Sequence, residues 1–180
     1  RGLLRRRFSE TLGDIGKPAL PGLQKALISH SNVIVRRAAA KTIKLVGDPS
    51  ALPDLYQAVV HDVDPVVQGS AIAAMAIFGG NAVKYLISIL SNPKSSAYQC
   101  GMASWGISFI GMDAAPSIKE AAKSQNKKVR AAAIGALSEI ILMSQGSDLE
   151  AKNLVIDGLD DISEDIRAES TRVLGELKGQ

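Results

Sequence analysis

The residue types with the widest chemical range are concentrated in one stretch, AYQCGMASWGISFIG, which covers residues 97–111. This stretch contains the only tryptophan and the only cysteine of the chain. Four of its side chains are candidates for contact with a ligand or a partner: Tyr98, Cys100, Ser104 and Trp105. Aromatic, thiol and hydroxyl groups on one helix favour binding of a flat apolar ligand or of an apolar side chain from a partner.

Two glycines, Gly101 and Gly106, lie inside this predicted helix, where each costs about 1 kcal/mol relative to alanine. Glycine is kept at such positions where another group approaches the backbone closely. One interpretation is a shallow pocket walled by Trp105 and floored by glycine. The alternative is a core helix, in which Trp105 and Phe109 pack inward and Gly101 admits a neighbouring helix.

A second candidate site is basic. Arg37, Lys41 and Lys44 fall at i, i+4 and i+7 of a predicted helix over residues 33–46, away from its apolar stripe. In the two related helices that follow, the residues at the matching positions are small or apolar. The last of these residues are Ala76 and Ile107. If these helices line a concave face, it changes from basic to apolar along its length. The stripe predicts binding of carboxylates or acidic side chains, and an ordinary solvated face is the alternative.

No conventional catalytic or metal-binding constellation accompanies these residues. His30 and His61 occupy nearly the same place at the ends of successive short helices, where an interaction with the helix dipole predicts a structural role. One cysteine and two histidines do not suffice for a protein-only zinc site, and the phosphate-loop and nucleophile-elbow motifs are missing from the sequence. Cys100 is read as a small buried residue rather than a nucleophile. We therefore predict no catalytic residue, no metal ligand and no required cofactor.

A repeated phrase positions the candidates: a polar residue, then four positions later an Arg or Gln that opens a helix rich in small residues. Its centres, spaced by 32, 31, 31 and 37 residues, are Arg36, Gln68, Gln99, Arg130 and Arg167, and the segment around Arg5 continues the series. The predicted N-caps are Asn32, Asp64, Ser95, Asn126 and Ser163. Glycines that end the helices follow at Gly16, Gly47, Gly79 and Gly111. Recurrence of Arg at a fixed position predicts structural hydrogen bonds to an Asp or a backbone carbonyl of an adjacent repeat.

Between these helices, five further segments each read as one short amphipathic helix. A pair of such helices cannot bury its apolar face alone, so stacked pairs share a continuous core. The sequence predicts an all-α fold, an α–α superhelix of the HEAT or armadillo type with about five helical hairpins after a leading half repeat. One domain is expected over residues 1–180, with repeats at roughly 1–16, 17–47, 48–79, 80–111, 112–146 and 147–180.

Charge is distributed unevenly along the chain. Residues 1–50 carry ten Lys or Arg against three Asp or Glu, a net charge of +7, and residues 148–180 carry four against nine, a net charge of −5. Such a gradient can steer an acidic partner to one end. Nucleic acid is a disfavoured partner, because the basic segment lacks interleaved aromatic residues and the other end is acidic. The residues considered for it are Arg1, Arg5, Arg6, Arg7, Arg37 and Lys41. No apolar run reaches the roughly 20 residues that span a bilayer, so no membrane span is predicted.

The phrases VRRAAAKTIKLVGDPSALPDL and DPVVQGSAIAAMAIFG resemble the HEAT-like repeats of the phycobilisome (bilin) lyase family. That family includes the E- and F-type lyase subunits and their chaperone-like relatives, and the resemblance covers nearly the whole chain. It implies a scaffold or chaperone-like assembly factor that holds a partner protein or a linear tetrapyrrole on its concave face. It also implies partners such as a phycobiliprotein or a second HEAT-repeat subunit, in a cyanobacterial cytoplasm or a plastid stroma.

The alternative function is a subunit of a bilin lyase, which attaches a linear tetrapyrrole to a phycobiliprotein cysteine. In that case the nucleophile belongs to the substrate protein, and the lyase orients the bilin. The scaffold is the leading interpretation, because no residue set specific to lyase activity is found. The sequence begins at Arg1 inside a helical pattern, which we read as a fragment or a processed chain.

Overall fold

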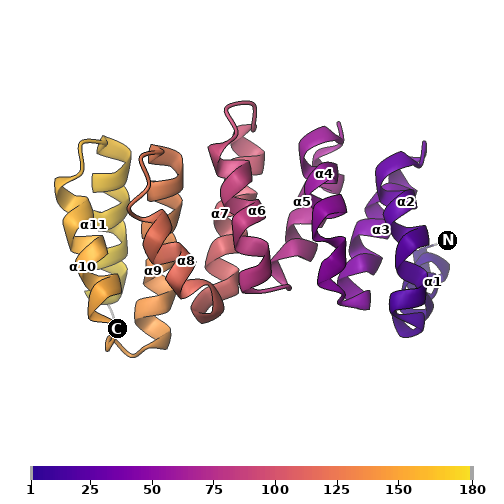
Figure 1. Ribbon diagram of the computed structural model, residues 1–180, viewed down its shortest axis with the longest axis horizontal. Coiled ribbons are helices and arrows are strands. Elements are labelled where there is room, and N and C mark those ends of the chain that lie inside the picture. Colours follow the sequence, from indigo (N-terminus) through magenta and orange to yellow (C-terminus); the bar gives the residue numbers. More distant parts are fainter. Residues whose placement is uncertain (1, 179–180) are drawn as a thin grey trace.

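The computed structural model describes residues 2–178, except for the side chains of residues 2, 4 and 5. Arg1 and the Arg5 side chain, both considered for the basic segment, lie outside this description. Every regular element in the described range is helical, so the predicted all-α solenoid is confirmed. Figure 1 shows the helices side by side in one elongated array, with the two chain ends at opposite ends.

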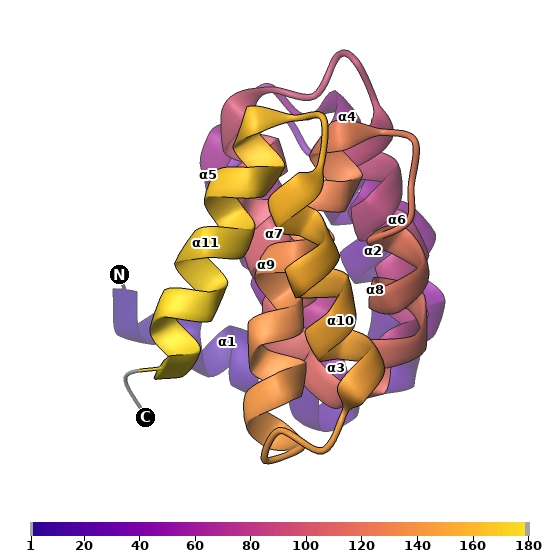
Figure 2. The ribbon, with the colours of Figure 1, turned by 90° about the vertical axis from the view of Figure 1, so that its left-hand side faces the viewer.

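The helices form two layers (Figures 1 and 2). One layer holds the odd-numbered helices, α1 (Gly2–Ile15), α3 (Val33–Val46), α5 (Pro65–Ala76), α7 (Ala97–Ile110), α9 (Lys127–Met143) and α11 (Glu164–Lys178). The other holds α2 (Leu20–Ser29), α4 (Leu52–His61), α6 (Gly80–Ser91), α8 (Ala115–Ala121) and α10 (Leu149–Asp157). Each even-numbered helix forms a hairpin with the odd-numbered helix that follows it, and α1 precedes the five hairpins as a leading half. Short 3-10 turns lie at Lys17–Ala19, Pro49–Ala51, Gly111–Ala114 and Gly158–Asp160.

The odd-numbered layer is the more closely packed of the two. Each odd-numbered helix contacts the next one extensively from α1 through α11, whereas successive even-numbered helices touch one another less. An array that is tighter on one layer curves toward it, so the odd-numbered helices form the inner, concave layer. This layer carries the helix of residues 97–110 and the basic stripe of α3.

Most of the predicted helix boundaries agree with the structure. Asn32, Asp64 and Asn126 each accept a hydrogen bond from a first-turn backbone N–H of the helix that they precede. The prediction of Ser95 as a cap is wrong by one residue: Ser96 caps α7, in a reciprocal capping box with Gln99, while the Ser95 hydroxyl donates to the Ile89 carbonyl. The reciprocal bond to Gln99 satisfies two first-turn donors at once, which fixes the helix start at Ala97.

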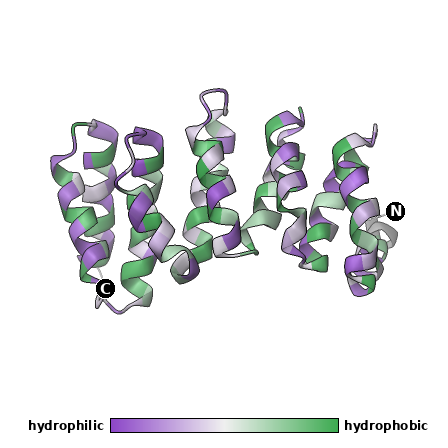
Figure 3. Cartoon of the chain, in the orientation of Figure 1, coloured by the Kyte–Doolittle hydropathy of each residue, from purple (hydrophilic) through white to green (hydrophobic). Residues whose placement is uncertain are grey.

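The four helix-ending glycines all adopt positive φ, from 57° at Gly79 to 72° at Gly47. This backbone region favours glycine because a Cβ would collide there. One continuous apolar core runs between the layers, and many of its members are alanines and branched aliphatics with no exposed surface, such as Ala40, Ile43 and Ala71. Figure 3 shows hydrophobic and hydrophilic residues mixed along the helices, as expected where one side of each helix is buried.

Candidate functional site

A groove of about 670 Å³ opens between α7, α9 and α11. We call it the central groove. Its walls come from one residue of α6 and three inner-layer helices: Leu90, Ala97, Cys100, Gly101, Ser104, Trp105, Ser108, Lys128, Ala131, Ala132, Gly135, Asp165, Glu169 and Arg172. Small side chains dominate the facing sides of α7 and α9, and neighbouring helices with small facing side chains leave space between them. The volume lies in the range of pockets that bind small organic ligands.

Trp105 forms the apolar wall of the groove. Its side chain is 45% exposed and stacks on Phe109, which is 58% exposed, with ring centroids 5.3 Å apart and an interplanar angle of 29°. These exposures exclude the interpretation of Trp105 and Phe109 as core residues. The pair presents an aromatic surface to solvent on the inner layer, where a flat ligand can stack on it.

The two glycines of α7 have different structural causes. A Cβ at Gly106 would lie 3.3 Å from Leu86 and 3.5 Å from Ile72, so this glycine permits close packing of α7 on its neighbours. A Cβ at Gly101 would meet no atom within 4 Å. Gly101 therefore does not admit a neighbouring helix, contrary to one interpretation of the sequence, and instead leaves the floor of the groove open.

The far wall of the groove is charged. Arg172 of α11 donates from Nε and a terminal nitrogen to the two carboxylate oxygens of Glu169, at 3.0 and 2.6 Å, and its other terminal nitrogen donates to Glu176. The hydrogen bonds that Arg172 donates to Glu169 and Glu176 raise the pKa of Arg172 above its ordinary value. Gly135 of α9 makes room for this cluster, because a Cβ there would collide with Glu169. Lys128, in the first turn of α9, is the other cation of the wall.

Three of the four predicted α7 residues line the groove: Cys100, Ser104 and Trp105. Cys100 is partly exposed, and the Ser104 hydroxyl donates to the Cys100 carbonyl at 3.0 Å. Tyr98 does not line it. Its hydroxyl lies over Gly69 of α5, where any Cβ would collide with it. Tyr98 is 47% exposed and lies beside α5, on the other side of α7 from the groove.

The predicted basic stripe is on α3, two hairpins away from the groove. The Arg37 guanidinium forms a bidentate ion pair with Asp64, in which two of its nitrogens donate to the two carboxylate oxygens at 3.0 and 2.6 Å. This pair lowers the pKa of Asp64 to about 2. Lys41 and Lys44 are exposed. The predicted continuation of the stripe along the concave face is wrong at its last position in both helices, because Ala76 and Ile107 are each only 2% exposed. It is also wrong at Gly69, the first position in α5, which is buried. These positions face the core in α5 and α7.

Comparison with known proteins identifies the repeat and the relatives of the chain. A family model described as HEAT repeats matches residues 2–76. The bilin biosynthesis protein MpeU of a Synechococcus strain is 39% identical over 180 residues, which are the whole of this chain and 60% of that protein. Residues 2–76 thus match HEAT repeats, and the whole chain is similar to this bilin biosynthesis protein. The resemblance seen in the sequence is thereby confirmed. The chain spans about 60% of the length of this curated relative.

Two solved structures are similar to this chain at low sequence identity. Human deoxyhypusine hydroxylase is 16% identical, with a TM-score of 0.50 over the whole of this chain and 81% of the other. The complex of CpcE and CpcF of phycocyanin lyase from Nostoc is also 16% identical, with a TM-score of 0.43 over 97% of this chain and 91% of the other. The first likeness shows a common helical-repeat fold.

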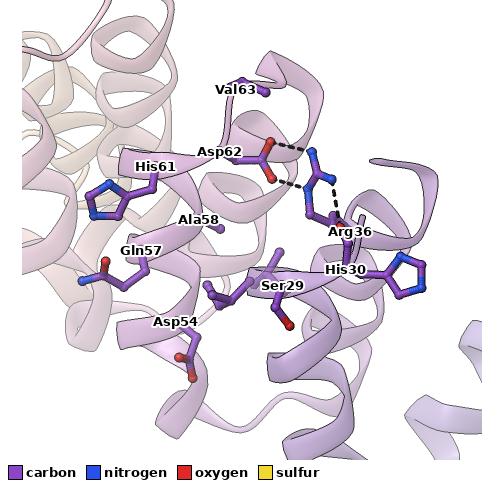
Figure 4. A pocket seen from close by; sticks show the side chains of 11 residues that line it. Ser29, His30, Arg36, Asp54, Gln57, Ala58, His61, Asp62 and Val63 are labelled. Carbon is purple, nitrogen blue, oxygen red and sulfur yellow. Dashed lines mark hydrogen bonds and ion pairs between the residues drawn. The ribbon is translucent and has the colours of Figure 1, made fainter. Parts of the chain in front are cut away.

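In this HEAT-repeat protein the recurring Arg positions serve the structure, as predicted. The Arg36 guanidinium donates to both carboxylate oxygens of Asp62 on the next hairpin, at 2.6 and 3.0 Å, and to the His30 and Ser31 carbonyls. Figure 4 shows this pair beside a pocket of about 330 Å³, with the rings of His30 and His61 directed to opposite sides. Arg130 pairs with Asp161 of the next hairpin in the same way. Arg167 donates only to the carbonyls of Asp161 and Ile162, within its own hairpin.

Across residues 2–178, no three His, Cys, Asp or Glu side chains are grouped so that they could hold a metal ion. No helix of the described chain is long and apolar enough to cross a bilayer.

Proposed function

We propose that this protein binds a linear tetrapyrrole in the central groove and holds it for a phycobiliprotein, as a scaffold or chaperone-like assembly factor. The observation that carries the proposal is the juxtaposition, on the concave layer, of an exposed Trp105–Phe109 stack with a floor of small residues. An extended conjugated ring system can stack on the aromatic pair over the open backbone at Gly101. The relationship to a protein named for bilin biosynthesis supports this class of ligand.

The chemistry of the groove favours holding over group transfer. Its possible nucleophiles are Cys100, Ser104 and Ser108, and no histidine lines it. The Ser104 hydroxyl donates to a backbone carbonyl, so it is not oriented toward a general base. A groove with these properties supplies orientation and exclusion of water, which are the contributions expected of a protein that presents a reactive ligand to another protein.

A second candidate function, a bilin lyase subunit, uses the same groove. There the cysteine of the acceptor phycobiliprotein attacks the bound bilin, and this chain fixes the geometry of that attack. Lys41, Lys44 and the basic end of the array then remain as predicted contacts for acidic side chains of the acceptor or of a second HEAT-repeat subunit. Either role places the protein where phycobiliproteins are assembled, in a cyanobacterial cytoplasm or a plastid stroma.

Coexpression with a bilin and an apo-phycobiliprotein, with and without a candidate second HEAT-repeat subunit, tests both candidates. The informative variant is Gly101→Leu, which places a side chain in the groove at a position where a Cβ would meet no atom within 4 Å. The matched control is Gly175→Leu on α11, which also has open space around it and lies outside the groove. Circular dichroism checks that both variants are folded.

The readouts are coloured complex on affinity purification and zinc-induced fluorescence of covalent product. Bilin bound to the chain without enhanced product supports the scaffold, and product that requires this chain supports the lyase subunit. In both cases Gly101→Leu abolishes the signal and Gly175→Leu retains it. A wild-type chain that yields neither complex nor product contradicts the proposal, and so does a Gly101→Leu variant that behaves as wild type.

A further inference from the structure

The charged wall of the central groove contains two cations that differ in how far their charge is already neutralised. Arg172 donates to two glutamates, Glu169 and Glu176, so all of its nitrogens have carboxylate partners. Lys128 also lines the groove, is exposed, and has no carboxylate within ion-pair distance among the described side chains. A carboxylate that enters the groove therefore meets a cation available for pairing only at Lys128.

The N-terminal ends of α9 and α11 also favour an anion near Lys128 over one near Arg172. Lys128 lies in the first turn of α9, whose first turn carries no acidic residue, and its backbone N–H donates to the Asn126 cap. The corresponding turn of α11 carries Glu164 and Asp165. The positive end of the helix dipole is thus offset by acidic side chains at α11 and not at α9. Both the side chain and the helix end favour an anion beside Lys128.

The rest of the wall restricts where an anionic ligand can place its charge. Asp165 and Glu169 line the same side of the groove as Arg172, and they repel a carboxylate placed near α11. They can instead accept hydrogen bonds from N–H groups of a ligand. The opposite side is apolar and is formed by Trp105. A ligand with a flat conjugated body, N–H donors and a carboxylate satisfies all three sides only when its carboxylate points to the start of α9.

We infer that Lys128 recognises the propionate carboxylates of a linear tetrapyrrole and so fixes the direction in which the pigment lies in the groove. This inference rests on the proposed function for the class of ligand. It differs from the prediction that Arg37, Lys41 and Lys44 bind such carboxylates, because those cations are two hairpins away from Trp105. Lys128 acts here as a specificity-determining residue that discriminates the free acid from a neutral analogue.

The test uses biliverdin and its dimethyl ester, which share the conjugated body and differ in their carboxylates. Trp105 is the only tryptophan of the chain, so quenching of its fluorescence reports binding in the groove without a label. The variant is Lys128→Gln. The control is Lys127→Gln, an identical charge change at an adjacent exposed residue that lies outside the groove and 3.7 Å from Asp165.

We expect the wild-type chain to bind the free acid about tenfold or more tightly than the ester, a difference of about 1.4 kcal/mol. Lys128→Gln removes this difference by weakening the acid alone, and Lys127→Gln preserves it. Equal binding of acid and ester by the wild type overturns the inference while leaving the proposed function intact, and so does an equal loss of both ligands in Lys128→Gln. If neither ligand quenches Trp105 in the wild type, both the inference and the proposed function fail.

Discussion

The two ends of the array are joined by charged side chains, whereas the middle hairpin, α6–α7, is held by neutral contacts. Between the first and second hairpins the ion pairs are Lys17–Asp48, Arg36–Asp62 and Arg37–Asp64. Between the fourth and fifth they are Lys119–Asp148, Lys119–Glu150, Lys123–Glu150, Lys127–Asp165 and Arg130–Asp161. Within the described residues, α6–α7 makes no ion pair with either neighbouring hairpin.

The sequence carries this difference in a simple form. The central residue of a repeat is Arg when an Asp lies six residues before the central residue of the next repeat. Arg36 and Asp62 are one such pair. The central residue is Gln when another residue type stands at that place: Gln68 goes with Pro93, and Gln99 goes with Ser124. Gln99 donates to the Val59 carbonyl of α4 at 2.6 Å, a neutral bond in place of a charged one. The same position thus joins hairpins through charged bonds at the ends and through a neutral bond in the middle, beside the central groove.

The largest expected effect comes from overpacking the middle hairpin. Gly106→Leu forces a side chain against Leu86 and Ile72, and we expect it to lower the free energy of unfolding by about 3 kcal/mol. Gly101→Leu meets open space, so it should change stability little. Urea denaturation followed by circular dichroism measures both. Equal losses in the two variants would show that the two faces of α7 are not packed differently.

A smaller effect is expected from removing the neutral bond of the middle hairpin. Gln99→Leu leaves the Val59 carbonyl without its donor and the Ser96 N–H without its side-chain acceptor. We expect a loss of about 2 kcal/mol, because an unpaired buried polar group keeps its full desolvation cost. Gln68→Leu, whose amide donates to the Asp62 carbonyl in a less buried place, is the control. A loss at Gln68 as large as that at Gln99 would contradict the account.

The ion pairs at the ends should each contribute less and should respond to salt. Asp161→Asn keeps the acceptor for the Ser163 N–H and removes the charge that pairs with Arg130, so the expected loss is about 1 kcal/mol at low ionic strength. The loss should shrink in 1 M salt, since screening weakens charge pairs. Asp160→Asn, at an exposed neighbour, serves as the control. A loss that is unaffected by salt would mean that the pair does not act electrostatically.

The smallest expected effect is the acid dependence of the first pair of hairpins. Hydrogen bonding from Arg37 lowers the pKa of Asp64 from 3.8 to about 2 in the folded chain. Its contribution to stability is therefore complete above about pH 4 and is lost as the pH falls from 4 toward 2. Asp64→Asn should be less stable than the wild type at pH 6, and the gap should narrow steeply as the pH falls from 4 to 2. Denaturation midpoints across this range measure the difference, and a gap that is the same at pH 2 as at pH 6 would refute the ion pair as its cause.

Local sequence chemistry predicts most of the fold because it acts within a few residues. Asn32 caps a helix through its own side chain, and Gly47 ends one through its own backbone. The structural role of Arg36 is predicted correctly as well, because Arg recurs at the same position of the repeat. Ser95 was misplaced, because Gln99 forms a reciprocal capping box with Ser96.

The groove was only partly predictable. Cys100, Ser104 and Trp105 were singled out by residue type, but α7 is apolar on every side, so periodicity could not distinguish an exposed Trp105 from a buried one. Lys128 and Arg172 were missed, since charged residues on helices normally read as a solvated face. The signal that could have pointed to them is the run of small residues, Ala131, Ala132 and Gly135, which faces α7.

Protection of Cys100 from alkylation tests most directly whether the central groove is the binding site. Cys100 is the only cysteine of the chain, is partly exposed and lines the groove. Mass spectrometry of the reaction with N-ethylmaleimide therefore reports on one place. We predict that saturating biliverdin slows this reaction at least tenfold, and that it does not slow alkylation in a Cys100→Ser, Ser88→Cys variant, whose thiol lies on α6 outside the groove. An unchanged rate at Cys100 would contradict the account, as would equal protection at both positions.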